Sequence, residues 1–344
     1  MLRSPPAIVT RLLRVVEVIA VRGGQVMRPR GADRSGFLHE LVLHSSPEEM
    51  LEFIVPFIRD GVAAEEPTLV LVRPETAATV LDRVEPSPHL LLLPALGQPG
   101  RPAADVRATE TLLAGYGPGT AQVRILNQEP VVPEAQWHEW RRLEAVVNLA
   151  MRRHNAWAVC VYDRRPLTDE MVEDLYATHH LTGRGEHHRR NDRYQDPVEF
   201  ISKHQDAPPD PVERETPSAQ LVDPSPATAR AAVAGFARQT RLPGQEIENI
   251  VIAAHEAVSN AIRHGRPPVV LRLWVEPDRL TVTVTDTGPG PTDPFVGLLP
   301  PEHSDGAGLG LWISHQLVDI THRRHPDGYT IRLATAALPP NLTP

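Results

Sequence analysis

Three short stretches near the end of the chain decide its fold: HEAVSNAIRHG at residues 255–265, DTGPG at 286–290 and GAGLGL at 306–311. The first predicts a helix that carries a carboxylate and an amide on one face. The second predicts a strand that ends in an aspartate and a glycine turn, and the third a glycine-rich loop that opens another helix. Each stretch alone is weak evidence. Together, in this order, they predict one binding site made of a helix, a strand end and a loop.

The first stretch ends a predicted amphipathic helix over residues 243–264. Its apolar side chains recur with helical spacing, so we expect one buried stripe formed by Ile247, Ile250, Val251, Ala254, Val258, Ala261 and Ile262. Glu256, Asn260 and His264 follow at intervals of four residues on the opposite side. A solvated polar face explains that spacing. A nucleotide site also explains it, because the Asn260 amide oxygen suits Mg²⁺ and the Glu256 carboxylate suits a general base.

The second and third stretches offer contacts to the base and to the phosphates of a nucleotide, which that helix alone does not provide. Asp286 follows an alternating strand predicted over residues 280–285, where its carboxylate can accept a hydrogen bond from an adenine amino group. Glycines that open a helix leave backbone N–H groups free to surround phosphate, and the glycines in these two stretches are Gly288, Gly290, Gly306, Gly308 and Gly310. The segment 291–305 between the stretches is a candidate lid. An ordinary turn is the alternative for each stretch taken alone.

The residue inventory excludes several other classes of protein. The chain has 344 residues, a net charge of −8 at pH 7 and one lysine, Lys203. A P-loop or a protein-kinase fold needs a lysine near its phosphates, and the C-terminal part of this sequence has none. The acidic balance argues against direct nucleic-acid binding, and no apolar run is long enough for a membrane helix. The single cysteine, Cys160, excludes an internal disulfide and fits a reducing, cytoplasmic compartment.

Read together, Glu-x-x-x-Asn-Ala-x-x-His-Gly, Asp-x-Gly-x-Gly and Gly-x-Gly-Leu-Gly resemble the asparagine box and the two glycine boxes of a large ATPase superfamily. That superfamily includes gyrase, heat-shock chaperones, histidine kinases and mismatch-repair proteins. The domain over residues 221–336 is most similar to the anti-sigma-factor serine kinases of bacterial partner-switching pathways. The resemblance implies ATP and Mg²⁺ as cofactors, Glu256 as catalytic base, Asn260 on the metal and Asp286 on adenine. It implies further nucleotide contacts from His264, Gly288, Gly290, Gly306, Gly308, Leu309 and Gly310.

The same resemblance implies an activity. We expect an ATP-binding anti-sigma regulator of transcription that phosphorylates a serine or threonine of an antagonist protein under the control of a sensory domain. Its partners would be a sigma factor and that anti-anti-sigma antagonist, with a homodimer as a candidate assembly. The alternative is a non-catalytic, ATP-dependent protein-binding regulator, and a third option is a sensor that binds no nucleotide. The intact Glu256 favours a protein serine/threonine kinase.

The first half of the chain alternates short apolar runs with helical stretches. Strands are predicted at residues 39–44, 68–72, 89–93, 123–126 and 156–162. Helices are predicted from Ser46 onward and at residues 75–84, 134–154 and 168–179. This alternation predicts an α/β/α domain with a largely parallel sheet covered on both faces.

Part of this region also resembles a known family. Cys160-Val161-Tyr162-Asp163, Thr178-His179-His180 and the stretch NDRYQDP at 191–197 are similar to the sensory domain known as MEDS. The family has proline after the Thr-His pair, where this chain has His180. We expect signal sensing or protein docking here, and a buried, inert Cys160 rather than a redox sensor. A solvated loop is favoured over a metal site for His179, His180, His187 and His188.

The second half predicts an α/β domain with two layers, helices on one side and a mixed or antiparallel sheet on the other. Helices are expected at residues 225–239, 243–264 and 309–320, and strands at 270–276, 280–285 and 329–334. The expected order of domains is an N-terminal extension (1–35) that we expect to be disordered, a MEDS-like domain (36–203), a proline-rich linker (204–220), an ATPase domain (221–336) and a tail (337–344).

Overall fold

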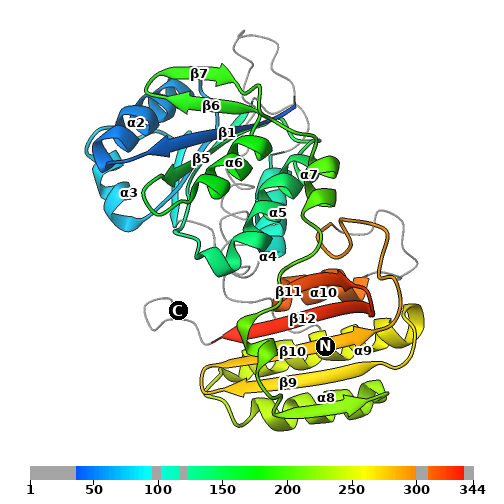
Figure 1. Ribbon diagram of the computed structural model, residues 1–344. Coiled ribbons are helices and arrows are strands. Elements are labelled where there is room, and N and C mark those ends of the chain that lie inside the picture. The colour runs from blue at the N-terminus through cyan, green and yellow to red at the C-terminus, as the bar shows by residue number, and fades with distance from the viewer. Residues whose placement is uncertain (1–35, 95–101, 117–121, 300–308, 337–344) are drawn as a thin grey trace. The chain divides into compact units, whose positions relative to one another are not determined.

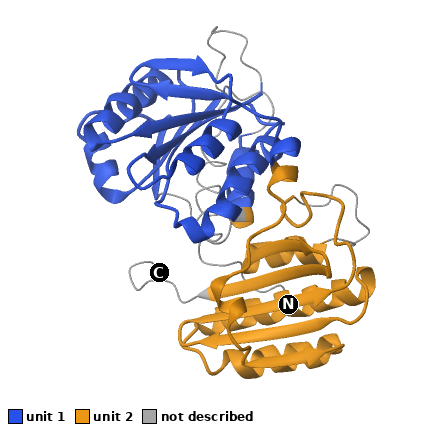
Figure 2. Ribbon diagram, viewed as in Figure 1, with its two compact units in different colours: residues 1–99, 105–200 blue, residues 100–104, 201–344 orange. Residues whose placement is uncertain are grey.

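The computed structural model describes residues 36–94, 102–116, 122–299 and 309–336. The chain divides into two compact units, one with residues 1–99 and 105–200, the other with residues 100–104 and 201–344 (Figure 2). We call them the N-terminal unit and the C-terminal unit. The expected extension over 1–35 and tail over 337–344 lie outside the described residues.

The N-terminal unit is built around a seven-stranded sheet with the order β3-β2-β4-β5-β1-β6-β7 (Figure 1). The strands are β1 (Phe37–His44), β2 (Thr68–Val72), β3 (Leu90–Pro94), β4 (Val123–Gln128), β5 (Ala156–Asp163), β6 (Leu181–Arg184) and β7 (His187–Arg190). All neighbouring pairs are parallel except β6 with β7. The predicted largely parallel sheet is therefore confirmed.

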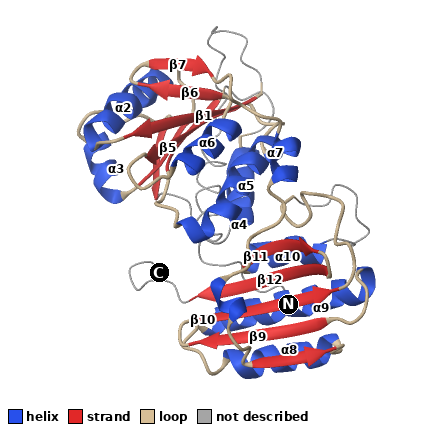
Figure 3. Cartoon of the chain, in the orientation of Figure 1, coloured by secondary structure: helices blue, strands red, loops and turns tan. Residues whose placement is uncertain are grey.

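Helices accompany these strands (Figure 3), and those over residues 102–114 and 197–203 were not predicted. They are α2 (Pro47–Ala63), α3 (Pro74–Leu81), α4 (Pro102–Ala114), α5 (Glu134–Ala150), α6 (Asp169–Thr178) and α7 (Pro197–Lys203). The Ser46 hydroxyl caps α2 by accepting a hydrogen bond from the Glu49 N–H at 3.1 Å. Apolar side chains of α2 and α3 pack with Val42, Val70 and Val159 in one core cluster on one face of the sheet.

The antiparallel pair β6–β7 is the main departure from expectation in this unit. His187 and His188 lie in β7 and not in a loop, because residues 187–190 pair with residues 181–184 at the edge of the sheet. His188 turns toward the interior, and its Nδ1 lies 2.8 Å from Oε1 of the buried Glu40. This strand was not predicted because β7 consists of histidines and arginines and has no apolar alternation, and exposed edge strands are often polar.

The C-terminal unit is a two-layer sandwich, as predicted. Its antiparallel sheet has the order β11-β12-β10-β9-β8, with strands β8 (Ala219–Val222), β9 (Val270–Glu276), β10 (Arg279–Asp286), β11 (Asp319–His325) and β12 (Gly328–Ala336). One face carries α8 (Pro226–Ala237), α9 (Gly244–His264) and α10 (Leu309–Leu317) (Figure 1). Leu273, Val282 and Leu333 are fully buried in the core between the layers.

Two details of this unit differ from expectation. The last helix stops at Leu317, and β11 follows at Asp319, so the apolar residues Val318 and Ile320 belong to the sheet edge of the core and not to a longer helix. Ile262 was expected in the buried stripe of α9 but is 52% exposed. It follows Ala261, the last buried residue of that stripe, and one further residue turns its side chain about 100° around the helix axis.

Residues 207–215 lie on the sheet face opposite the helices. The Ala207 N–H donates to the carbonyl of His322 in β11 at 2.7 Å. Arg279 of β10 pairs with Asp210 at 2.6 Å, and Arg323 of β11 pairs with Glu213 at 2.7 Å. A short 3₁₀ helix, η1 (Pro211–Arg214), has a complete capping box from Asp210. This segment, which we call the strap, is thus an ordered part of the C-terminal unit.

Candidate functional site

The carboxylate of Glu256 lies directly against the first turn of α10. Glu256 is half-buried on α9, and a Cβ atom built on Gly310 would lie 2.2 Å from Oε2 of Glu256. A Cβ there would force the Glu256 carboxylate to move, so glycine at position 310 allows this close approach. The free backbone N–H groups that open a helix therefore lie next to a carboxylate. This is the first contact point of the site.

Asp286 forms the second contact point, at the end of β10. Its side chain is only 5% exposed, and its Oδ1 accepts hydrogen bonds from the N–H of Gly288 at 2.7 Å and of Arg266 at 3.1 Å. Two backbone donors fix the direction of the carboxylate. A Cβ on Gly288 would lie 2.7 Å from the same oxygen, so the turn after β10 has to follow the carboxylate closely.

Gly265 joins the end of α9 to this carboxylate. A Cβ on Gly265 would lie 2.4 Å from Cγ of Asp286. Glycine often ends a helix in the left-handed conformation, but Gly265 has φ −85° and ψ −160° and is not left-handed. Gly265 instead allows the end of α9 to approach the end of β10 closely, because it has no side chain. Gly265 and the Arg266 N–H were missed as site residues, although Gly265 closes the first quoted stretch.

Helix α9 connects the two contact points. From Glu256 to Gly265 the helix rises by about 13 Å, since each residue adds about 1.5 Å. Asn260 lies halfway along this path and is half-buried, while His264 is exposed at the last helical turn. The helix thus places an acid and an amide between the first contact point and the strand-end carboxylate of the second.

The remaining predicted residues divide into three groups. Leu309 begins α10 and is 36% exposed beside Gly310. Gly290 has φ +71°, and a Cβ there would lie 2.4 Å from the ring of Tyr329, so its glycine is explained by packing in the C-terminal core. Gly306 and Gly308 lie outside the described residues, as does the second half of the candidate lid over 291–305.

Gly310 offers a direct test of the first contact point. We expect Gly310→Ala to reduce any activity that depends on Glu256 by at least about tenfold, because the new methyl group displaces the carboxylate. A displacement of about 1 Å in a catalytic group can lower the reaction rate by about 10²-fold. Gly235→Ala in α8 is the matched control, since a Cβ there meets nothing within 4 Å. That control should be active and more stable by about 0.4–1 kcal/mol. Equal activities of both variants with Mg-ATP would contradict the prediction.

Comparison with known proteins assigns both units to families. The family model of the histidine kinase-like ATPase domain matches residues 222–335, and that of the MEDS domain (methanogen/methylotroph, DcmR sensory domain) matches residues 38–180. Serine-protein kinase RsbW of Bacillus cereus (strain AH187) is 30% identical over 119 residues, which cover 30% of this chain and 73% of that protein. RsbW of Bacillus licheniformis is 31% identical over 123 residues, with the same coverage.

Among solved structures, the mycobacterial sensor histidine kinase MprB is similar over 35% of this chain and 98% of its own, at 20% identity and a TM-score of 0.24. In the described parts of the chain, no helix is both long and apolar enough to cross a membrane. The two family models agree with the order of units seen in the structure. The chain therefore belongs to the RsbW-like family of histidine kinase-like ATPase domains, joined here to a MEDS-type domain.

Proposed function

We propose that the C-terminal unit binds ATP with Mg²⁺ along the face of α9 described above. Asn260 would hold the metal through its amide oxygen, since Mg²⁺ accepts few protein oxygens and keeps its waters and phosphates as other ligands. Asp286 would accept a hydrogen bond from the adenine amino group through its fixed carboxylate. Gly288, Leu309 and Gly310 would border the nucleotide together with His264, Gly290, Gly306 and Gly308. The N-terminus of α10 favours negative charge and suits the phosphates.

We further propose that the protein is a serine/threonine kinase. Bound Mg-ATP supplies the phosphoryl group, and Glu256 accepts the proton of the attacking hydroxyl on an antagonist protein. One observation carries this proposal: the Glu256 carboxylate touches the helix start at Gly310, where the phosphates are expected. The relatives are named serine-protein kinases, which supports the same reaction.

The family membership supports a proposal for the biological role. We propose an anti-sigma regulator in a partner-switching pathway that binds a sigma factor and an anti-anti-sigma antagonist in the cytoplasm. The MEDS-type unit would control that activity in response to a signal. A homodimer is the assembly that we would test first, by light scattering at several protein concentrations.

A transfer assay with the full chain tests the proposal. The protein is incubated with γ-labelled ATP, Mg²⁺ and antagonist proteins from a host genome that encodes it. We expect label on a serine or threonine of one antagonist, and none when EDTA replaces Mg²⁺. If the protein binds Mg-ATP but labels no antagonist, the kinase is rejected and the non-catalytic, ATP-dependent regulator is the function that fits. If the protein binds no Mg-ATP, the nucleotide site itself is rejected.

A further inference from the structure

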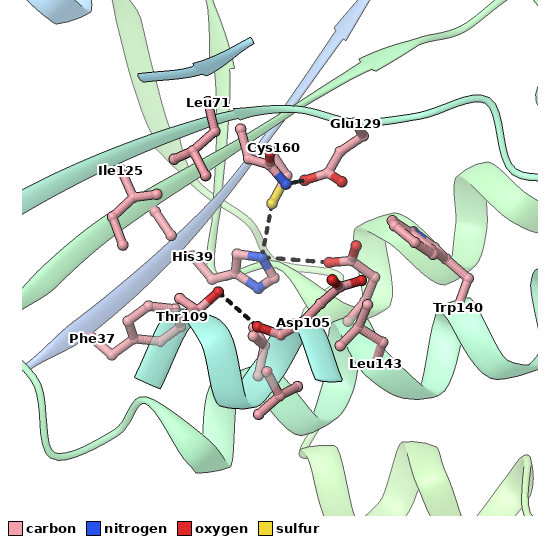
Figure 4. A pocket seen from close by; sticks show the side chains of 15 residues that line it. Phe37, His39, Leu71, Asp105, Thr109, Ile125, Glu129, Trp140, Leu143 and Cys160 are labelled. Carbon is pink, nitrogen blue, oxygen red and sulfur yellow. Dashed lines mark hydrogen bonds and ion pairs between the residues drawn. The ribbon is translucent and has the colours of Figure 1, made fainter. Parts of the chain in front are cut away.

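Four buried side chains with metal-binding atoms meet inside the N-terminal unit. They are His39 of β1, Glu144 of α5, Cys160 of β5 and His179 directly after α6, and their donor atoms all lie within 4.8 Å of one another. None is more than 7% exposed. Figure 4 shows His39 next to Cys160 among the residues that line a cavity. The family comparison assigns no chemistry to these residues, and the proposed kinase does not use them.

The hydrogen bonds of His39 determine which of its nitrogens faces the cluster. Its Nδ1 lies 3.2 Å from Oδ1 of Asn148. The amide of Asn148 donates through Nδ2 to the carbonyls of Thr178 at 2.8 Å and Glu144 at 3.2 Å, so its oxygen must face His39. His39 therefore carries its proton on Nδ1. Its Nε2 lone pair points at the cluster, 3.3 Å from Sγ of Cys160.

His179 is held in the same way. Its Nδ1 donates to the carbonyl of Leu175 at 2.7 Å, which again leaves a lone pair on Nε2. That Nε2 atom has no hydrogen-bond partner, although the side chain is fully buried. An outer N–H donated to a carbonyl and an inner lone pair without a partner are typical of a histidine that ligates a metal.

Glu144 completes a set of atoms that repel one another. Its Oε1 accepts a hydrogen bond from the Tyr162 hydroxyl. Its Oε2 lies 3.4 Å from Nε2 of His39 and 3.5 Å from Nε2 of His179. With the sulfur of Cys160, four electron-rich atoms face one another in a buried space. Such an arrangement is costly unless protons or a cation lie between them.

We propose that these four residues bind a divalent cation of the zinc class. Ligand bonds of about 2.0–2.3 Å in a tetrahedron place neighbouring donor atoms about 3.3–3.8 Å apart, and three pairs here lie 3.3, 3.4 and 3.5 Å apart. Thiolate and imidazole donors select Zn²⁺ over Mg²⁺ or Ca²⁺. A thiolate, a carboxylate and two neutral imidazoles also balance the charge of the ion, which a buried site requires.

Protons are the competing occupants of the cluster. A proton on the Cys160 thiol or on the Glu144 carboxyl can also lie between the donor atoms. A metal ion has to displace such a proton, so metal uptake should release acid. A small cavity of about 80 Å³ borders His39, Glu144 and Cys160 and leaves room for one added small ligand on the ion.

Metal content and a cobalt spectrum of the full chain test this inference. We expect about one Zn²⁺ per purified chain, and, after exchange, a thiolate-to-cobalt charge-transfer band with the intensity of four-coordinate Co²⁺. Cys160→Ser should lose the band, and His179→Gln should lower the affinity for Zn²⁺ by about 10–100-fold or more. His187→Gln is the control, because that histidine is exposed on β7 and outside the cluster.

The outcomes separate the inference from its alternatives. A folded wild-type chain that takes up no Zn²⁺ and gives no thiolate–cobalt band overturns it, whatever the variants do. Retention of the band in Cys160→Ser also overturns it, because this chain has no other cysteine. Nucleotide binding by the C-terminal unit is measured on the same samples, so a failure of the proposed kinase does not affect the result.

Discussion

Replacing Glu256 with glutamine is expected to lower phosphate transfer by about 10²–10⁴-fold, the contribution typical of a general base. The amide keeps the size of the side chain, so it still fits against Gly310, but it cannot accept a proton. Nucleotide affinity should change little, since the base acts on the attacking hydroxyl. The measurement is single-turnover transfer from labelled ATP to an antagonist, together with calorimetry of Mg-ATP binding.

Glu248→Gln is the control for this experiment. Glu248 is exposed on the same helix two turns earlier, so the substitution changes the net charge equally without touching the site. It should transfer phosphate at the wild-type rate. Transfer by Glu256→Gln within a few-fold of wild type would remove Glu256 from the role of base, and equal losses in both variants would indicate an effect of charge alone.

Asn260→Ala is expected to abolish the Mg²⁺-dependent part of nucleotide binding. Wild-type protein at about a hundredfold excess of Mg-ATP over its Kd gains about 2.7 kcal/mol of unfolding free energy, and the variant should lose most of that gain. The free protein should not be destabilised, because alanine is the better helix former at an interior position of α9. Thermal unfolding with ATP, with either Mg²⁺ or EDTA, measures both effects.

Arg263→Ala provides the comparison for Asn260→Ala, since Arg263 is exposed on the following turn of α9. Its stabilisation by Mg-ATP should equal that of wild type within about 0.5 kcal/mol. If Asn260→Ala shows an undiminished difference between Mg²⁺ and EDTA, the metal is held elsewhere and the proposed site is wrong.

The architecture of both units could be predicted because hydrophobic periodicity specifies it. Residues 69–72 form a continuous apolar run and lie in a fully buried parallel strand, β2. Leu280, Val282 and Val284 alternate and became the core face of β10. Elements without such a pattern were missed: β7 is a run of histidines and arginines, and β11 ends in four basic residues after Ile320 and Thr321. Their strand pairing is decided by neighbours far along the chain.

The candidate site was predictable in part. Spacing along one helix placed Glu256 and Asn260 on one side, because a helix fixes neighbours four residues apart. The approach of Gly310 to Glu256 and of Gly265 to Asp286 depends on how α10 and β10 pack on α9, which spacing does not describe. The buried cluster was harder still. The sequence grouped His179 with its neighbour His180, whereas its true partners lie on β1, α5 and β5, as far as 140 residues earlier.

The strap has a practical consequence for anyone who wishes to study the C-terminal half by itself. A fragment that starts at residue 221, where the sequence suggests a boundary, would lack Asp210, Glu213 and the first half of strand β8. It would leave Arg279, Arg323 and the face of β9 around Trp274 without cover, and a bare sheet edge invites aggregation. Starting the fragment near residue 201 should therefore give a well-behaved, monodisperse protein where the shorter one precipitates.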